Sequence, residues 1–164
     1  MDDDWQVRVD AVWAEAAALG DDDLVSAIDA LAAERDPGDA LALLERAGAR
    51  DSTGREEQAA PLYRAALAAG LDDARRGQAV IQLASTERNL GHPESLALLS
   101  AEFAGQPDHR LADAATAFAA LALASAGRPT EGLVAVLHAL AAHLPRYRRA
   151  VDAYADELLE GGRP

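Results

Sequence analysis

The 164-residue chain contains no cysteine and no lysine. Without cysteine it has no disulfide framework and no thiolate ligand for a metal. Without lysine it has no Walker-type phosphate loop, no kinase-type lysine and no Schiff-base nucleophile, because all of these need an ammonium group. These absences exclude several classes of enzyme, and we expect neither catalytic residues nor a cofactor.

Aromatic residues are also scarce, at 4% of the chain, and β-branched residues are few. A β-sandwich needs both kinds of side chain in quantity. Alanine dominates instead, and alanine is the strongest helix former. The composition therefore predicts an all-α fold.

Positive charge is in short supply, because 15 basic residues face 28 acidic residues and leave a net charge of −13. Residues 1–40 hold twelve acids against Arg8 and Arg35. Phosphate backbones repel a chain of this charge, so we expect no nucleic-acid partner. The acidic stretch either keeps the chain soluble or docks a basic partner.

No long apolar run is present, and the first residues read MDDDWQ, with acids where a secretory signal carries positive charge. No segment reaches the ~18 uninterrupted apolar residues that a membrane span needs. We therefore expect a cytoplasmic protein with no membrane contact.

Glycine and proline fall at regular intervals between amphipathic segments. Gly54, Gly70, Gly91, Gly105 and Gly127 each follow such a segment, where a left-handed helix end favours glycine. Gly20 followed by three aspartates predicts the end of one helix and the start of the next. The pattern predicts nine helices joined by short connections, over about residues 3–19, 22–34, 38–52, 55–69, 73–90, 93–104, 109–126, 129–143 and 146–160. Short connections make neighbouring helices antiparallel.

Three glycine turns, at Gly54, Gly91 and Gly127, are spaced by 37 and 36 residues. Before each turn a helix carries a small residue near its middle, and these residues are Ala47, Ala84 and Ala120. After each turn the next helix opens with a small residue, and these residues are Ala59, Ser95 and Gly132. Small residues let crossing helices approach closely. The repeat predicts three similar helix pairs.

This pattern resembles the tetratricopeptide repeat family over residues 38–145, including the run Tyr63, Ala66, Leu67 and the pair Ala139, Leu140. The spacing exceeds that family's usual 34 residues and is similar to a bacterial, actinobacterial-like subgroup with slightly long repeats. The resemblance implies a right-handed α-solenoid of antiparallel helix pairs. It also implies a protein-interaction module with no defined reaction. An ordinary helical bundle is the rival interpretation, and it needs no periodicity.

The predicted organisation has three parts. Residues 1–36 form a divergent helix pair carrying Trp5 and Trp13, which either cover the open end of the solenoid or form a self-association patch. Residues 37–145 form the three repeats. Residues 146–164 form a capping helix, as repeat arrays need at their ends, and a short tail.

No residue pattern supports a metal site. The four histidines are His92, His109, His138 and His143, and the last two are five residues apart rather than the four that place ligands on one helix face. Neither a nucleophile elbow nor a glycine-rich dinucleotide loop is present. We therefore expect no bound metal.

The first helix of each repeat pair is expected to line a concave groove. In the second pair this helix is unusually polar on one side, where guanidinium and amide groups can bind a carboxylate or a peptide backbone. The predicted groove residues are Arg50, Asp51, Gln78, Gln82, Ser85, Arg88 and Asn89, with Arg146, Tyr147 and Arg149 near the last helix. The alternative is that these residues form a solvated face or tie adjacent helices together.

The leading hypothesis is a scaffold or adaptor that binds a protein or peptide segment in the groove. The second is a structural protein that self-associates, as a homodimer for example, through the groove or the tryptophan-bearing end. An enzyme with a site in the groove is the third. The sequence does not identify the partner.

Overall fold

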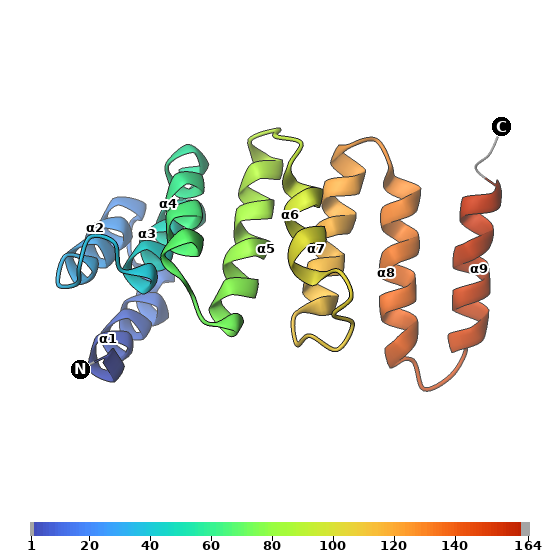
Figure 1. Ribbon diagram of the computed structural model, residues 1–164, viewed down its shortest axis with the longest axis horizontal. Helices are drawn as coiled ribbons and strands as arrows, with labels where there is room; N and C mark the ends of the chain where they lie inside the picture. Colours follow the sequence, from blue (N-terminus) through green and yellow to red (C-terminus); the bar gives the residue numbers. More distant parts are fainter. Residues whose placement is uncertain (1, 162–164) are drawn as a thin grey trace. The chain divides into compact units, whose positions relative to one another are not determined.

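The computed structural model describes residues 2–161, which form nine α-helices and no strand (Figure 1). The helices are α1 (Asp2–Glu15), α2 (Asp21–Ala32), α3 (Ala40–Ser52), α4 (Glu56–Ala69), α5 (Asp73–Asn89), α6 (Ser95–Phe103), α7 (Ala112–Ser125), α8 (Pro129–His143) and α9 (Arg148–Gly161). The all-α prediction and the nine predicted helices are confirmed. The predicted tail beyond α9 lies outside the described residues.

Two helix ends differ from the sequence prediction. The first helix stops at Glu15 and continues as one 3₁₀ turn over Ala16–Ala18. The seventh begins at Ala112 rather than near residue 109, because the preceding segment forms successive turns. In these turns the amide of His109 donates to Gln106 O and the amide of Ala112 donates to His109 O. Each turn forms its own backbone hydrogen bond without a helix, so the helical spacing of apolar residues does not predict where such turns lie.

The helices group into two compact units that divide after Leu90, with α1–α5 in the first and α6–α9 in the second. The division falls inside the second predicted repeat pair, between α5 and α6. The predicted boundaries at residues 36 and 145 follow the repeat rather than compactness, and they stay a prediction.

Capping residues account for several helix starts and ends. The Asp39 side chain accepts hydrogen bonds from the amides of Leu41 and Ala42, at 3.0 and 2.9 Å, and so starts α3. At the end of α3, Gly54 has φ +69°, and the amide of Arg55 donates to Arg50 O at 2.8 Å. This is the Schellman geometry that the glycine pattern predicts. Gly20 is an exception, because it precedes α2 with extended backbone (φ −74°) and does not adopt the left-handed form.

The core of the first unit contains both large and small side chains. Trp5, Val9 and Ile28 are buried between α1 and α2, and the Trp5 indole donates to Leu31 O at 2.9 Å. Trp5 is 4% exposed, so it belongs to this core. The predicted small residues Ala47, Ala59 and Ala84 are all fully buried, as close helix crossings require.

The second unit shows the closest helix approach at Gly132. A Cβ atom at this position would lie 2.7 Å from Ala120 O and 3.1 Å from Ala120 Cα, both backbone atoms of α7. Only glycine allows α8 to pack at this distance. The sequence prediction that Ala120 and Gly132 lie at a crossing is confirmed.

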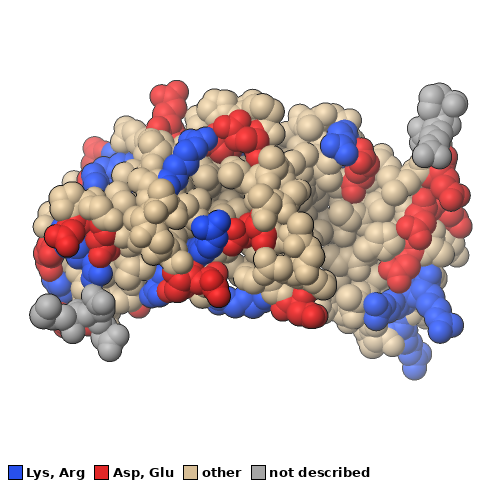
Figure 2. All heavy atoms as spheres, in the orientation of Figure 1, with Lys and Arg blue, Asp and Glu red and all other residues tan. Residues whose placement is uncertain are grey.

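Acidic and basic side chains lie next to each other at several places on the face shown in Figure 2. Arg128 binds Glu131 through two hydrogen bonds of 2.7 and 2.6 Å, and Arg75 binds Asp72 at 2.5 Å. Exposed pairs of this kind contribute little stability each, about 0–1 kcal/mol. Among the described residues, no helix is long and apolar enough to span a membrane.

Candidate functional site

A cavity of about 470 Å³ opens between α1, α3 and α5 in the first unit. The helices α1, α3 and α5 are the first helices of three successive helix pairs, so each pair contributes one set of side chains to the lining. The lining is mostly polar and comprises Gln6, Asp10, Trp13, Leu44, Glu45, Gly48, Asp51, Ser52, Arg75, Gln78 and Gln82.

Helical spacing explains why these residues face one space. On α1 the lining residues recur at intervals of four and three, at Gln6, Asp10 and Trp13. On α5 they recur at intervals of three and four, at Arg75, Gln78 and Gln82. Residues three and four apart share one helix face. Each helix therefore presents one polar stripe to the cavity.

Trp13 joins α1 to α3 at the floor of the cavity. Its indole Nε1 donates to Glu45 Oε2 at 2.7 Å. Its ring lies against Gly48, where a Cβ atom would be 3.4 Å from the ring edge. A small residue at position 48 therefore lets the edge of a large aromatic ring approach α3.

Two carboxyl groups of the cavity are partly removed from water. Burial raises the pKa of Glu45, and hydrogen bonds from Trp13 and Gln6 oppose that rise. Burial also raises the pKa of Asp51, against hydrogen bonds from Thr86 and Tyr63. A hydrogen-bond donor or a cation that enters the cavity would therefore stabilise the charged form of both carboxyl groups.

Asp51 also ties three helices together. Its carboxylate accepts from Thr86 Oγ1 of α5 at 2.9 Å and from Tyr63 Oη of α4 at 3.3 Å. Burial and the neighbouring carboxylate of Asp51 raise the pKa of Tyr63, so this phenol stays protonated and donates. Asp51 therefore both lines the cavity and fixes its wall.

Gln6 has hydrogen-bonding capacity left over. Its Nε2 donates to Asp10 Oδ1 at 2.9 Å. Its Oε1 is buried and accepts no hydrogen bond from any described residue. A buried acceptor without a donor costs roughly 1–3 kcal/mol.

The predicted groove residues other than Arg50 divide into three groups. Asp51, Gln78 and Gln82 line the cavity. Ser85, Arg88 and Asn89 lie further along α5, outside its lining, and Arg88 Nη2 donates to Asn89 Oδ1 at 2.8 Å. The structure places Arg146, Tyr147 and Arg149 in the second unit, exposed around the start of α9. Their role as ligand-binding residues stays a prediction.

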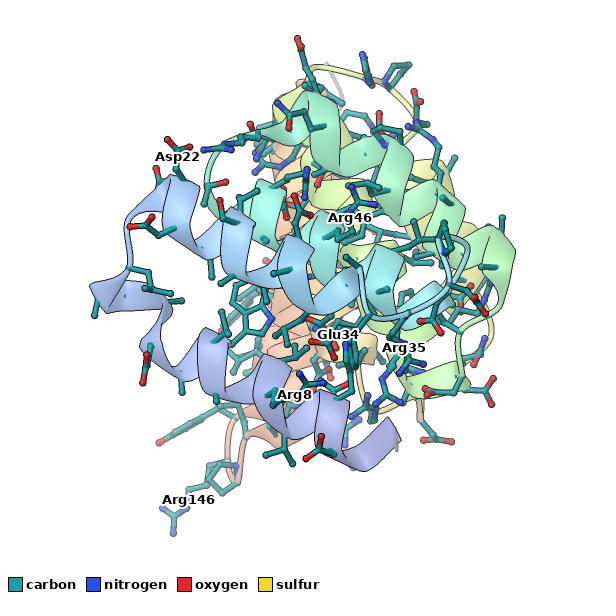
Figure 3. All side chains as sticks on the ribbon, turned by 90° about the vertical axis from the view of Figure 1, so that its left-hand side faces the viewer. Arg8, Asp22, Glu34, Arg35, Arg46 and Arg146 are labelled. Atoms are coloured by element: carbon teal, nitrogen blue, oxygen red, sulfur yellow. The ribbon has the colours of Figure 1, made fainter. Side chains whose placement is uncertain are left out.

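Arg50 points away from the cavity, toward α2. Its guanidinium binds Asp29 at 2.8 and 3.0 Å, and Arg46 binds the same carboxylate at 2.9 Å. Figure 3 shows Arg46 beside α2. The hydrogen bond from Arg50 is the largest cause that lowers the pKa of Asp29. Arg50 thus ties adjacent helices together, the alternative role that the sequence left open.

A second cavity, of about 390 Å³, lies around this ion pair and is lined by Asp29, Arg35 and Arg46 among others. Three of its charged groups already have partners, since Arg46 bonds Asp29, and Arg35 bonds Asp39 at 2.8 Å and lies 4.6 Å from the centre of the Trp5 ring. Nearby, Arg8 and Glu34 point toward each other (Figure 3) and bond at 2.8 Å. These side chains stabilise α1, α2 and α3, so the first cavity is the better candidate.

Sequence analysis missed the lining residues of α1 and several on α3 and α5. Residues 1–36 were predicted to be a helix pair outside the repeat, so Gln6 and Asp10 were not predicted as site residues and Trp13 was predicted only as an end cover or a self-association patch. The signal was available as matching stripes, in which Gln6, Asp10 and Trp13 have spacing similar to that of Glu45, Gly48 and Ser52. Arg75 begins the same stripe that predicted Gln78 and Gln82.

Comparison with protein families supports the predicted repeat. Comparison with curated proteins and with solved structures gives no significant match. A family model described as "Tetratrico peptide repeat" matches residues 40–158. The match runs from α3 into α9 and covers well over half of the chain. The chain therefore belongs to the tetratricopeptide repeat family.

Proposed function

We propose that this chain is a protein-interaction adaptor that holds a segment of a partner protein in the cavity between α1, α3 and α5. Tetratricopeptide repeats generally mediate protein–protein interactions and are typically non-enzymatic scaffolds. The proposal adds the place and the chemistry of binding. We further propose that it acts in the bacterial cytoplasm.

The observation that carries the proposal is a cavity lined by the amide side chains of Gln6, Gln78 and Gln82. Gln78 and Gln82 each offer one carbonyl oxygen and one amide group, so each can both accept and donate. A peptide backbone presents the same two groups at every residue. An extended segment laid across the three helices therefore matches the lining.

The charge of the cavity favours a basic segment over an acidic one. Three carboxylates line it, at Asp10, Glu45 and Asp51, against the single guanidinium of Arg75. Arg75 is already bonded to Asp72 at 2.5 Å, so its charge is largely compensated. A Lys or Arg side chain of the partner would form charge-assisted hydrogen bonds with the carboxylates. This differs from the carboxylate-binding role that the sequence suggested for Arg88.

The test is affinity capture from lysate with three forms of the chain in parallel. These are wild type, the Gln78→Ala, Gln82→Ala double variant, and the Ser85→Ala, Asn89→Ala double variant. All four positions lie on α5, but only the first two line the cavity. We expect wild type and the second variant to retain the same protein. Loss of two hydrogen bonds should weaken binding by the first variant roughly tenfold or more.

Two results would contradict the proposal. One is equal retention by the glutamine variant and wild type, with the fold of both verified by circular dichroism. The other is a retained protein that binds more tightly as salt increases, because a basic segment on an acidic cavity must bind more weakly when its charges are screened.

A further inference from the structure

One stretch of the second unit departs from the acidic character of the chain. Between Glu131 and Asp152 there is no acidic residue, and the stretch contains Arg146, Arg148 and Arg149. Figure 2 shows blue spheres gathered at the start of α9. Residues 144–151, which we name the α9 basic segment, therefore give a chain of net charge −13 a local excess of positive charge.

The positive charges of the α9 basic segment are only partly used within the chain. Arg148 lies 4.0 Å from Asp152. Among the described residues, no carboxylate forms an ion pair with Arg146 or Arg149. Figure 3 shows Arg146 extending away from the turn between α8 and α9. Two guanidinium groups of the segment therefore remain available to another molecule.

Tyr147 lies in the middle of the segment and has an unusual backbone conformation. It is the one non-glycine residue with positive φ among those described, at +68°, and it is 77% exposed. Bulky residues seldom adopt this region, and such strain is concentrated where a chain meets a ligand or a partner. Tyrosine and arginine are also among the residue types most enriched at the energetic centres of interfaces. The segment thus has the composition of a bound group.

The cavity between α1, α3 and α5 carries the opposite charge. Its three carboxylates, Asp10, Glu45 and Asp51, accept hydrogen bonds from neutral side chains, and none forms an ion pair with a described residue. Trp13 adds an aromatic ring to the same lining, and guanidinium groups pack well against aromatic rings. The cavity therefore lacks the cation that its carboxylates and its aromatic ring would bind.

The size of the cavity and the charge of the whole chain restrict how a second copy could approach. The cavity holds about 470 Å³, within the range of about 300–1,000 Å³ that accommodates drug-sized ligands. An arginine side chain is smaller than such a ligand, so it can enter. Two complete chains repel each other, because each carries −13, and a close approach is favoured where basic surface meets acidic surface.

We propose that the α9 basic segment of one copy of this chain occupies the cavity between α1, α3 and α5 of a second copy. The inference rests on the proposed function, because it uses the same cavity, and it names the partner. Arg146, Tyr147 and Arg149, which sequence analysis placed in the binding groove, belong instead to the group that is bound. The two surfaces differ, so the contact is head-to-tail and can repeat from copy to copy.

The first experiment is sedimentation equilibrium of the full chain over a concentration series. We expect the mass of wild type to rise above that of one chain, 17.2 kDa, as concentration increases. The segment variant, Arg146→Ala with Arg149→Ala, should associate roughly tenfold or more weakly. The cavity variant, Asp10→Arg with Gln78→Arg, should lose association to a similar extent, because it places positive charge where the segment binds.

The matched control is Glu57→Arg with Gln58→Arg on α4. It makes the same change of charge as the cavity variant, at two exposed residues outside the cavity lining. The control should therefore associate as wild type does. Asp10 and Gln78 are exposed as well, so the cavity variant should also keep its fold, which helical circular dichroism verifies.

The second experiment mixes the segment variant and the cavity variant in equal amounts, at a concentration where each alone remains at the mass of one chain. The segment variant keeps an intact cavity, and the cavity variant keeps an intact segment. One contact can form between them, and no further copy can add at either end. We therefore expect a complex of two chains that does not grow as concentration increases.

The third experiment tests the segment directly. A fluorescently labelled peptide of residues 144–151, LPRYRRAV, is titrated with the full-length variants and followed by anisotropy. It should bind the segment variant, whose cavity is intact, and bind the cavity variant roughly tenfold or more weakly. Replacing its three arginines by glutamine should weaken its binding to the segment variant to a similar extent.

Three results would overturn the inference. Wild type that stays at the mass of one chain at its highest soluble concentration excludes a second copy as the occupant, although another protein captured through Gln78 and Gln82 would still support the proposed function. Association that survives either the segment or the cavity variant places the contact elsewhere. Variants that do not associate when mixed show that segment and cavity do not bind each other. Association that both variants abolish supports the inference even when lysate yields no other protein.

Discussion

The two compact units bury their apolar side chains to very different extents. In the first unit Ile28, Tyr63 and Leu83 are almost completely buried, and among its described residues Val7 is the exception as a large exposed apolar side chain. In the second unit the buried apolar residues are Leu99, Val134 and four alanines, whereas several leucines and tyrosines are exposed. The same family of helix pair therefore produces one well-filled core and one thin core.

The difference shows what small residues contribute to helix packing. Ala120 and Gly132 let α7 and α8 approach closely, but they bury little apolar area. Stabilisation by burial scales with area, at roughly 25 cal/mol per Å². In the first unit large side chains fill the space around the small crossing residues. In the second unit several of the large apolar side chains are exposed instead.

The largest expected effect is that of a Leu→Ala substitution in the first unit, compared with the same type of substitution in the second unit. Leu83→Ala removes a side chain that is 1% exposed in the first unit, whereas Leu121→Ala removes one that is 48% exposed in the second. We expect Leu83→Ala to lower the free energy of unfolding by roughly 2–5 kcal/mol, since a buried leucine leaves a cavity. Leu121→Ala should change it by about 0.5 kcal/mol. Urea unfolding followed by circular dichroism measures both.

Equal losses for the two variants would remove the contrast between a filled and a thin core. A larger loss for Leu121→Ala would invert it.

A smaller effect is expected at the closest helix crossing. Gly132→Ala adds a methyl group whose nearest neighbours are backbone atoms of Ala120, the nearest at 2.7 Å. Backbone atoms cannot rotate aside, so α7 and α8 must separate, at a cost of roughly 1–3 kcal/mol. The higher helix propensity of alanine offsets about 1 kcal/mol of this. Thermal unfolding should therefore show a lower midpoint for the variant.

Gly48→Ala is the matched control for that prediction. Its added Cβ would meet the edge of the Trp13 side chain at 3.4 Å, which is an ordinary contact distance. Here the gain in helix propensity should remain, so the midpoint should stay the same or rise. If Gly132→Ala were as stable as wild type, the close crossing of α7 and α8 would be disproved.

The helices could be predicted from the sequence because their ends depend on local chemistry. An aspartate such as Asp39 starts a helix by accepting hydrogen bonds from the amides two and three residues later. A glycine such as Gly54 ends a helix because it readily adopts the positive φ of a left-handed turn. Small residues at crossings were predicted for a similar reason. Ala47, Ala84 and Ala120 recur at intervals of 37 and 36 residues, and a close crossing accepts no larger residue.

The site was only partly predictable because periodicity gives the stripe of a helix but not its neighbour. Gln78 and Gln82 were found from their stripe, yet nothing local indicates that Gln6 and Trp13 of α1 face the same space. Arg50 immediately precedes Asp51 in the chain, but one bonds α2 and the other bonds α4 and α5. Successive helical residues are 100° apart, so neighbours in sequence readily serve different partners.

The exposed leucines of α8 were missed for a related reason. Their spacing is that of a buried stripe, and the amphipathic pattern does not distinguish a face covered by the same chain from a face left for another. Only the position of His138 between Asp152 and Asp156 shows which side of the α8–α9 pair is already used.

The smallest expected effect is a pH dependence confined to the second unit. Hydrogen bonding to Asp152, and then to Asp156, raises the pKa of His138 above its ordinary value of about 6.5. The folded chain therefore binds this proton more tightly than the unfolded chain does. The resulting stabilisation is fully present below about pH 6.5 and is lost as pH rises through the folded pKa.

Urea midpoints of wild type and His138→Gln, measured between about pH 5 and pH 8, should therefore converge as the pH increases. The exposed position of the imidazole makes this difference the smallest of those expected here. In an Asp152→Asn, Asp156→Asn background the same histidine substitution should give no pH-dependent difference, because its charged partners are gone. A difference that persists at high pH, or that survives in this background, would show that His138 holds α8 to α9 through packing rather than charge. Ion pairing would then not be the interaction that holds the polar sides of α8 and α9 together.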